Sequence, residues 1–254
     1  MNERLFGGER TFVHARCPSV RRQRLRVMLV ESKVKDQQLI DEKRRQIIEG
    51  AIRVFKEKGY HKATVREIAE EAKIGLGSIY DYVKSKDDIL YLFFENYVKS
   101  FYGRVREQTP PQADPLTRLE LTYRAFVESA MELEDQVMLS YTQAKYVRKD
   151  YLRIILQRET EIVEYFQRIV EEALAGAPGM DAFLEANFLV YSGVFGVIRR
   201  WILRPRFSKG ELADYLVRTQ AGELIDRIKR LRASGGEDRA RRGRTPKTAE
   251  RDEG

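Results

Sequence analysis

Two helix-start signals that lie close together place the strongest limit on how this chain can fold. In Thr64-Val65-Arg66-Glu67, a threonine can cap a helix while the glutamate three residues later bonds back to it. Ser85-Lys86-Asp87-Asp88 repeats the same logic, with Ser85 as N-cap and Asp88 at the third position. The residues between these signals can form only short helices joined by a tight turn. The sequence therefore predicts a compact helical head, followed by a longer helix that opens at Ser85.

Helical spacing continues on both sides of this segment. Apolar residues keep it from about Gln37 to Lys58, and Gly59 fits a C-terminal stop. Asp114-Pro115 is an N-cap and first-position pair that predicts a helix to about Glu134. Further helices are expected over 135–147, 149–175, 180–203 and 208–233. Because no alternating Val/Thr/Tyr segments bounded by Asn-Gly or Asp-Gly turns occur, we predict an all-α fold.

Composition narrows the class of protein. The 254 residues are 43% hydrophobic, which is enough to bury a core. Cys17 is the single cysteine, so an internal disulfide is excluded, and a cytoplasmic address is expected. No apolar run has the length of a signal peptide or a membrane span, so no membrane partner is expected.

The formal charge of +8 is unevenly distributed. Residues 1–35 carry nine Lys and Arg against three Asp and Glu, whereas residues 36–88 carry eleven of each. The excess therefore lies in the amino-terminal arm, and the folded part is nearly neutral. The overall charge alone is weak evidence for a nucleic-acid partner.

Four regions follow from these patterns. Residues 1–35 are expected to be a disordered basic arm, or sequence upstream of the true start, since Met28 lies close to the first helix. Residues 36–86 are expected to form the helical head, and residues 87–234 a larger helical bundle. Residues 235–254 are Gly-rich, mixed in charge and poor in large apolar side chains, so we expect a disordered tail.

Two short helices joined by a turn and braced by a third make a helix-turn-helix, whose second member enters the DNA major groove. The segment Gly75–Lys86 suits that role. Gly75 and Gly77 remove side chains from the point of closest approach, and Ile74, Ile79 and Val83 can face inward. The hydroxyls of Ser78, Tyr80 and Tyr82 and the charge of Lys86 can then meet phosphates.

The head resembles the DNA-binding region of TetR/AcrR-type transcriptional regulators. The resemblance covers about residues 38–95 and rests on three segments: Phe55 with Gly59-Tyr60 and Thr64 to Ala69; Gly77 to Val83; and Lys84 to Leu90. It implies operator DNA as partner, with Thr64, Ser78, Tyr82 and Lys86 on phosphates and Arg66, Leu76 and Tyr80 reaching bases. Gly75 and Leu76 depart from the family, which is often polar there, and suggest Leu76 against a thymine methyl.

Each of these residues also has a simpler interpretation. Thr64 would cap its helix with or without DNA, and Arg66 could be a solvated surface charge. Tyr80 and Tyr82 could pack inside the protein, although two tyrosines on successive faces of so short a helix cannot both be buried.

The bundle is expected to serve dimerisation and ligand binding. Paired heads gain affinity by spanning two half-sites, and we place the dimer face on the last two helices. Gly193 and Gly196 would allow close approach there, and the second of these helices would supply an apolar face of Leu212, Leu216, Leu224, Ile225 and Ile228. The alternative is that this face packs only within the chain.

A bundle core can also hold an apolar ligand. The family resemblance implies such a cavity here, and its candidate lining residues are aromatic: Phe101, Tyr123, Phe126, Tyr141, Phe166, Phe188, Tyr191, Phe195 and Trp201. Most aromatic residues at helical spacing are ordinary core residues. The predicted helix from about Asp87 to Glu107 would carry motion from this cavity to the head.

Residues 142–174 and 191–203 resemble the corresponding part of the family's fatty-acid-degradation repressors, through helix rhythm, Gly193 and Trp201. That resemblance implies a long-chain acyl-CoA as effector. Its phosphates would meet basic side chains that are otherwise solvated charges: Lys145, Arg148, Lys149, Arg199 and Arg200.

Enzyme classes find little support. Tyr-x-x-x-Lys occurs at Tyr80 and at Tyr141, but without the strand, the Gly-rich loop and the serine that accompany it in dehydrogenases. His14 and His61 are the only histidines, so neither a catalytic triad nor a metal site is indicated, and no cofactor is expected. Two alternatives to a fatty-acid regulator stay open: a regulator of an efflux pump that responds to lipophilic compounds, and a DNA-binding or adaptor protein without regulatory function.

Overall fold

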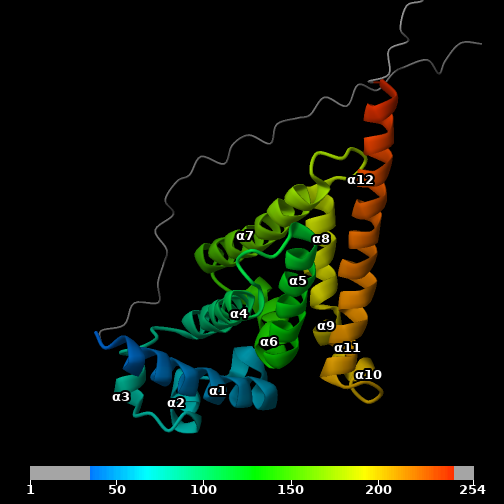
Figure 1. Ribbon diagram of the computed structural model, residues 1–254. Coiled ribbons are helices and arrows are strands. Elements are labelled where there is room, and N and C mark those ends of the chain that lie inside the picture. Colours follow the sequence, from blue (N-terminus) through cyan, green and yellow to red (C-terminus); the bar gives the residue numbers. More distant parts are fainter. Residues whose placement is uncertain (1–34, 243–254) are drawn as a thin grey trace, which may run out of the picture.

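A computed structural model describes residues 35–242, and these residues are helical without any strand. Figure 1 shows a small head of three helices below a larger bundle. The helices of the head are α1 (Gln37–Lys62), α2 (Val65–Glu71) and α3 (Leu76–Ile79). Those of the bundle are α4 (Lys86–Gln108), α5 (Pro115–Glu132), α6 (Glu134–Gln143), the 3-10 turn η1 (Ala144–Tyr146), α7 (Lys149–Leu174), α8 (Ala182–Gly193), α9 (Phe195–Ile198), α10 (Arg200–Leu203), α11 (Lys209–Leu216), the π-helical turn η2 (Val217–Gly222) and α12 (Glu223–Arg242). The predicted all-α fold is confirmed.

The three N-caps predicted from the sequence are present in the structure. The Thr64 side chain accepts the backbone N–H of Glu67 at the start of α2, and that of Ser85 accepts the N–H of Asp88 at the start of α4. Asp114 caps α5 with Pro115 in the first turn. These caps succeed because they need only residues three positions apart.

Two helix ends in the head differ from the prediction. Gly59 interrupts α1 with φ of 77°, as expected of a stop, but one more turn carries the helix to Lys62. The third helix is shorter than its pattern suggested, because regular α3 ends at Ile79 and turns carry the chain to Val83. Ile74, Ile79 and Val83 are nevertheless buried as predicted.

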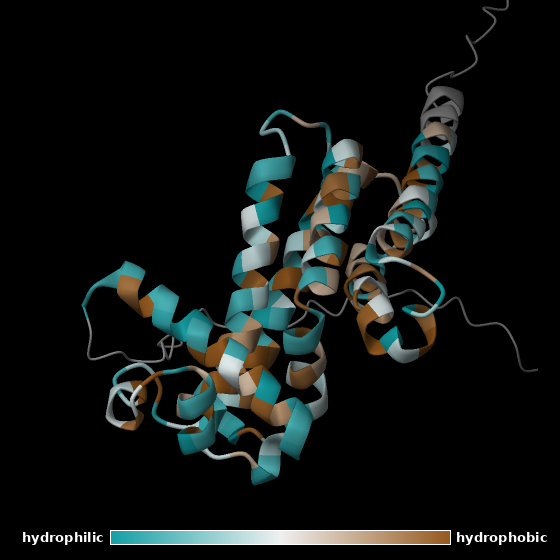
Figure 2. Cartoon of the chain, turned by 90° about the horizontal axis from the view of Figure 1, so that it is seen from below, coloured by the Kyte–Doolittle hydropathy of each residue, from teal (hydrophilic) through white to brown (hydrophobic). Residues whose placement is uncertain are grey.

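Two hydrophobic clusters organise the molecule. One fills the bundle between α4, α5, α7, α8 and α12. The other joins the head to the first half of α4 and to Val147, Tyr151 and Ile155 at the start of α7. Figure 2 shows brown, apolar residues gathered where these helices meet. The boundary expected at residue 86 therefore falls inside one continuous core. The head packs on the amino-terminal halves of α4 and α7.

The carboxyl-terminal helices are more broken than predicted. The helix expected over 180–203 divides into α8, α9 and α10, and that over 208–233 contains the π-helical turn η2. Close packing accompanies these breaks: a Cβ on Gly193 would meet Phe126 at 2.5 Å, and one on Gly196 would meet Met131 at 2.1 Å. The glycines thus admit side chains of α5, which a regular run of larger residues could not.

Residues 235–242, which were expected to begin the disordered tail, continue α12 in the structure. A helix that is already nucleated on a packed face extends by local hydrogen bonds, and no proline interrupts the chain before Pro246. The expected basic arm, residues 1–34, and the rest of the tail, residues 243–254, lie outside the described residues.

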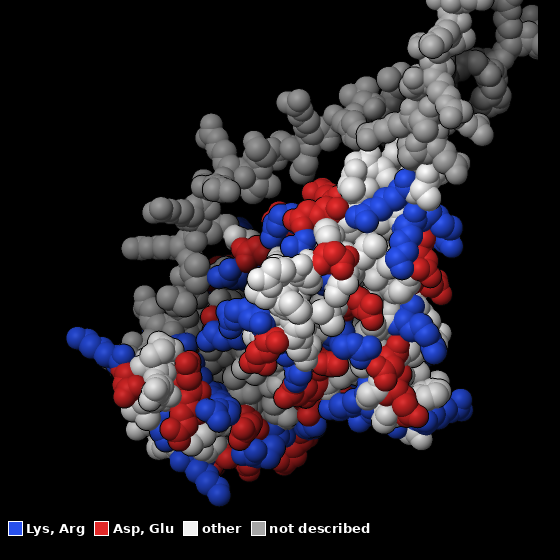
Figure 3. Space-filling view, viewed as in Figure 1, with Lys and Arg blue, Asp and Glu red and all other residues white. Residues whose placement is uncertain are grey.

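The surface shows no charge segregation on the face seen in Figure 3, where blue and red side chains alternate. Within residues 35–242, no helix is both long enough and apolar enough to cross a bilayer. The same residues contain no cluster of three His, Cys, Asp or Glu side chains that could hold a metal ion.

Candidate nucleic-acid interface and ligand groove

Most of the residues predicted to contact DNA are exposed on the head. Thr64, Arg66, Gly75, Gly77 and Ser78 are exposed. Leu76 and Tyr80 are large apolar or aromatic side chains with 37% and 45% of their surface in solvent. Ile79 anchors α3 from behind with no exposed surface, so the opposite side of this helix is presented outward.

The start of α2 is fixed by charge as well as by its cap. Lys58 donates to Glu67 at 2.8 Å, while Glu67 accepts from the Thr64 N–H at 2.9 Å. The hydrogen bond from Lys58 and those from Thr64 lower the pKa of Glu67 to about 2. Glu67 is therefore held ionised, and α2 is positioned before any partner arrives. The Lys58 contact lies outside the capping motif and could not be read from it.

Tyr82 and Lys86 are engaged inside the protein. Tyr82 is 6% exposed and belongs to the core of the head, so packing is the role that the structure gives its ring. The Lys86 ammonium donates to the backbone carbonyls of Tyr60 at 2.8 Å and His61 at 3.1 Å, and lies over the Tyr60 ring. It therefore satisfies carbonyls at the end of α1. Contact of either residue with phosphate stays a prediction.

Gly75 and Gly77 are not required by the protein's own packing. A Cβ on Gly77 would meet nothing within 4 Å, and one on Gly75 only Ser78 Oγ at 3.7 Å. Neither residue has positive φ, so the backbone does not demand glycine at either position. Gly50 is different, because its Cβ would meet Ala72 N at 2.8 Å where α1 and α2 cross. The two α3 glycines leave room for something outside the chain.

A polar cluster ties the head to the bundle at the start of α4. We call Tyr60, Lys86, Asp87, Asp88 and Tyr151 the junction cluster. The Tyr60 hydroxyl donates to Asp87 at 2.5 Å, and the Tyr151 hydroxyl donates to Asp88. Asp88 is 3% exposed and also accepts from Lys84 N at 2.6 Å. Desolvation, and then the carboxylate that each phenol faces, raises the pKa of both tyrosines. Both remain donors at neutral pH.

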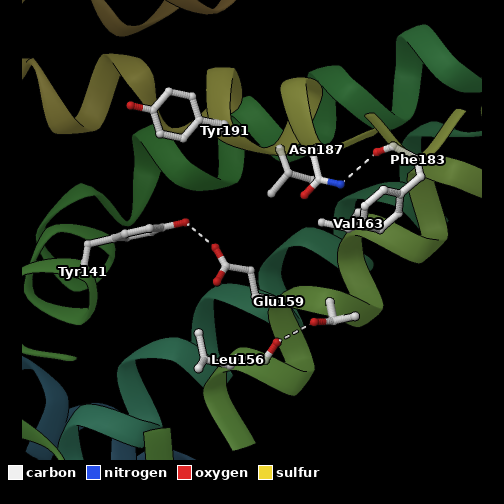
Figure 4. A pocket seen from close by; sticks show the side chains of 9 residues that line it. Tyr141, Leu156, Glu159, Val163, Phe183, Asn187 and Tyr191 are labelled. Carbon is white, nitrogen blue, oxygen red and sulfur yellow. Dashed lines mark hydrogen bonds between the residues drawn. The ribbon is translucent and has the colours of Figure 1, made fainter. Parts of the chain in front are cut away.

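A groove of about 340 Å³, which we call the α7/α8 groove, opens between α7 and α8 with Tyr141 of α6 at its side (Figure 4). It is lined by Tyr141, Leu156, Glu159, Thr160, Val163, Phe183, Asn187, Val190 and Tyr191. Across it, the Tyr141 hydroxyl donates to Glu159 Oε1 at 2.9 Å. Desolvation and the nearby carboxylate raise the pKa of Tyr141, which keeps the phenol protonated. The groove lies at the lower end of the size range of small-molecule sites, roughly 300–1,000 Å³.

The structure separates the nine predicted ligand-binding aromatics into three groups. Phe101, Tyr123, Phe126 and Phe166 are buried and pack on one another as ordinary core. Tyr141 and Tyr191 line the groove. Phe188, Phe195 and Trp201 point to solvent, with Phe188 68% and Trp201 63% exposed. The expected enclosed tunnel is an open groove, and the sequence missed Leu156, Glu159 and Phe183 because helical spacing does not reveal which helices face each other.

The residues expected to form a dimer face are packed within the chain. Leu212, Leu216, Leu224, Ile225 and Ile228 are all buried in the bundle core. The exposed apolar side chains lie elsewhere on the same region of the chain: Phe183, Leu184, Phe188, Tyr191, Phe195, Trp201, Ile202 and Tyr215. We call this set the α8–α11 apolar face. Contiguous exposed apolar patches on proteins often mark interaction surfaces.

Most of the basic residues expected to meet nucleotide phosphates already have partners. Arg148 pairs with Asp150 at 2.5 Å, and Arg200 pairs with Asp135 at 2.7 Å. Lys145 and Arg199 lie over the rings of Tyr146 and Trp201. Asp135 also receives Lys56 of α1 at 2.6 Å, a link between head and bundle that no sequence motif signalled.

Comparison with known proteins identifies the family. The model of bacterial regulatory proteins of the tetR family matches residues 47–91, which hold the junction cluster's α4 carboxylates and all of α2 and α3. HbdR, an HTH-type transcriptional regulator of Aromatoleum sp. (strain CIB), is 30% identical over 189 residues, covering 74% of this chain and 81% of that protein. The chain belongs to the tetR family of bacterial regulatory proteins. The resemblance seen in the sequence of the head is thereby confirmed.

A further relative and two solved structures extend the comparison. The fatty acid metabolism regulator protein of Bacillus subtilis (strain 168) is 38% identical over 169 residues, covering 62% of this chain and 82% of that protein. Among solved structures, KstR2 of Mycobacterium tuberculosis superposes with a TM-score of 0.57 at 22% identity, over 78% of this chain and 97% of that one. AibR, solved with isovaleryl coenzyme A and operator DNA, gives 0.55 at 19% identity, over 70% and 97%. These two structures show the shared fold.

Proposed function

We propose that this chain is a homodimeric repressor that binds operator DNA through α2 and α3 and is released by an apolar effector in the α7/α8 groove. The observation that carries the proposal is the combination of two features. The outward side of α3 carries Gly75 and Gly77, which internal packing does not require, and a ligand-sized groove lies on α7, the helix that also holds Tyr151. Membership of the tetR family supports DNA binding, and the Bacillus subtilis relative supports fatty acid metabolism as the regulated process.

Sequence-specific DNA binding is tested with duplexes that the protein selects from a randomised pool. Fluorescence anisotropy with the selected duplex and a scrambled one, titrated with salt, separates two functions. Both affinities should fall with salt, because phosphate contacts release counterions. A repressor keeps an affinity ratio of about 10³ or more between the two duplexes, whereas an adaptor or architectural protein does not.

Homodimerisation is proposed through the α8–α11 apolar face, in place of the residues first expected. Leu184, Phe188, Tyr191 and Phe195 recur at helical spacing along α8 and α9 and are all exposed. A second copy of this chain would cover them, and paired heads could then reach two successive major-groove segments. Phe183 and Tyr191 belong both to the α8–α11 apolar face and to the lining of the groove. The second copy would therefore also cover the open side of the groove.

A fatty acyl-CoA is the proposed effector class. Its acyl chain would occupy the groove, and AibR, which has the same fold, was solved in complex with isovaleryl coenzyme A. The test is operator release by a panel of acyl-CoA thioesters from short to long chains, with free coenzyme A as control. The assignment fails if no thioester changes operator affinity at saturation, since a ligand shifts an equilibrium only by its differential affinity.

The efflux-type alternative is supported by one observation, the Glu159 carboxylate beside apolar side chains, which could receive a lipophilic cation. Dodecyltrimethylammonium, tested in the same release assay, addresses it. Release by this cation without release by any thioester would favour the alternative. The reverse pattern would favour the acyl-CoA assignment.

Transmission between the sites is proposed to run along α7. Its first half holds Tyr151, which bonds to Asp88 of α4, and its middle holds Leu156, Glu159 and Val163 of the groove. A ligand that wedges between α7 and α8 would displace α7 as a rigid rod. The junction cluster would carry that displacement into α4 and the end of α1, changing the spacing of the two heads.

A further inference from the structure

The outward side of α3 and of its two flanking residues offers little hydrogen-bonding chemistry to a base pair. The exposed residues there are Gly75, Leu76, Gly77, Ser78 and Tyr80. None of these side chains carries the guanidinium that contacts guanine through two hydrogen bonds, or the amide that contacts adenine in the same way. What remains is two hydroxyl groups and the apolar side chain of Leu76. This segment therefore makes no paired side-chain contact with a purine.

Leu76 projects between two positions that have no side chain. It is 37% exposed, and it belongs neither to the core of the head nor to the residues packed against that core. A Cβ on Gly77 would meet nothing within 4 Å, and one on Gly75 only Ser78 Oγ at 3.7 Å. Ile79, which is fully buried, holds the opposite side of the helix against the head. A partner can therefore approach Leu76 closely from outside.

The polar residues around this segment do not supply the missing group. Tyr82 is 6% exposed and packs in the core of the head, and the Lys86 ammonium donates to two carbonyls at the end of α1. Arg66 is an exposed cation, but it lies on α2. Leu76 is therefore the main chemical feature that α3 itself presents.

The position of Leu76 decides what its side chain would meet. A helix-turn-helix places the first residues of its second helix against base edges in the major groove, and Leu76 is the first residue of α3. The apolar group that a base edge exposes in that groove is the C5 methyl group of thymine. A leucine side chain makes no hydrogen bond, so it does not distinguish the O4 atom of thymine from the N4 group of cytosine. The methyl group on C5 is the feature that Leu76 can recognise.

We propose that Leu76 reads the C5 methyl group of one pyrimidine in each operator half-site, so that thymine is preferred there and 5-methylcytosine can replace it. The contact removes two apolar surfaces from water, which is favourable. Leu76 is thus a specificity-determining residue, and methylation of a cytosine at that position turns a weak site into a stronger one. The inference rests on the proposed function in taking α3 as the reading helix, and it adds the chemical group that is read.

The test uses the operator duplex that the full-length protein selects from the randomised pool. Each thymine is replaced in turn, in both half-sites, by deoxyuridine, which lacks only the methyl group. At one position the replacement should weaken binding about 15-fold, because each of the two buried methyl groups contributes about fourfold. Cytosine at that position should bind at least as weakly as deoxyuridine. 5-Methylcytosine should then bind at least about fivefold more tightly than cytosine.

Leu76→Ala shows whether Leu76 is the reader. Its affinities for the thymine and deoxyuridine duplexes should agree within about twofold, near the wild-type affinity for deoxyuridine, because the side chain and the methyl group act as a pair. Leu39→Ala shortens a leucine of 38% exposure on α1 and, as the matched control, should keep the wild-type ratio. Arg66→Ala should change both affinities by the same factor. Leu76→Ala should also keep the Tm of wild type, because Leu76 lies outside the core of the head.

Three results would overturn the inference while leaving operator binding intact. The first is a selected duplex in which no thymine depends on its methyl group. The second is a Leu76→Ala variant that keeps the full preference for thymine over deoxyuridine. The third is 5-methylcytosine that binds no better than cytosine. Failure to select any duplex over scrambled DNA would instead remove the proposed function together with the inference, so the two failures are distinguishable.

Discussion

At the scale of single residues, Gly77 of α3 is a position where folding does not require glycine but DNA binding is expected to. Gly77 has helical backbone geometry, and its Cβ would meet nothing within 4 Å. Gly77→Ala should therefore stabilise the fold by about 0.5–1 kcal/mol, because alanine loses less backbone entropy on folding. It should at the same time weaken operator binding, because the methyl group occupies the surface expected to approach DNA. Thermal denaturation and anisotropy measure the two effects on one sample.

Gly103→Ala is the matched control for that substitution. Gly103 lies inside α4, and its Cβ would also meet nothing within 4 Å. The stability gain should be similar, with operator affinity unchanged. Equal affinities for wild type and Gly77→Ala would show that DNA does not approach α3 closely at this point.

Backbone strain at one residue of the helix-turn-helix leads to a second prediction. Lys73 has φ of 56°, in the left-handed region that costs a non-glycine residue about 1–2 kcal/mol. Lys73→Gly should relieve this cost and raise the free energy of unfolding by up to about 1 kcal/mol, once the entropy of glycine is included. Ala175→Gly, at the end of α7 with φ of 52°, is the parallel case. A lower Tm in both variants would contradict the strain argument.

At the scale of helices, α8 contributes residues both to the groove and to the α8–α11 apolar face. Phe188 is 68% exposed and lies on the face proposed to meet a second copy. Phe188→Glu should give a monomer in analytical ultracentrifugation, because a charge would be buried at an apolar contact without a partner. Operator affinity should fall by at least about tenfold, while the helical circular dichroism spectrum stays unchanged. Leu39→Glu on α1 adds the same charge at another exposed apolar position and should remain dimeric.

At the scale of the whole molecule, α7 links the groove to the junction cluster through the Tyr151–Asp88 contact, beside the apolar packing of Tyr151 and Ile155 on the head. Tyr151→Phe keeps the ring and deletes the donor to Asp88, which then retains its bonds to Lys84 N and Ser85 Oγ. Effector affinity measured directly should stay within about threefold, whereas the effector-induced loss of operator affinity should shrink by at least about fivefold. Stability should fall by about 1–3 kcal/mol, as for other lost bonds to buried charges.

Tyr165→Phe provides the comparison on the same helix. Tyr165 packs on Phe101 and Tyr102, away from the junction cluster. It should leave both effector affinity and operator release unchanged. Full effector response in Tyr151→Phe would place the transmission elsewhere, with the Lys56–Asp135–Arg200 link as the next candidate.

The sequence by itself determined the helices and the head. Caps at Thr64, Ser85 and Asp114 and the inward positions Ile74, Ile79 and Val83 depend on residues a few positions apart, so a local pattern carries them. The exposed face of α3 followed from the same spacing. The features of the head are also what the family model covers, since it matches residues 47–91, whereas Asp114 lies beyond it.

Only the tertiary structure decided which apolar faces meet. Periodicity shows that a helix has an apolar side, but the partner of that side depends on contacts between segments far apart in the chain. Phe126 fills the space beside Gly193, so it became core, while Phe188 on the same helix as that glycine was left outside. For the same reason, Leu212 and Ile228 proved internal, and Glu159 came to face Tyr141 across the groove.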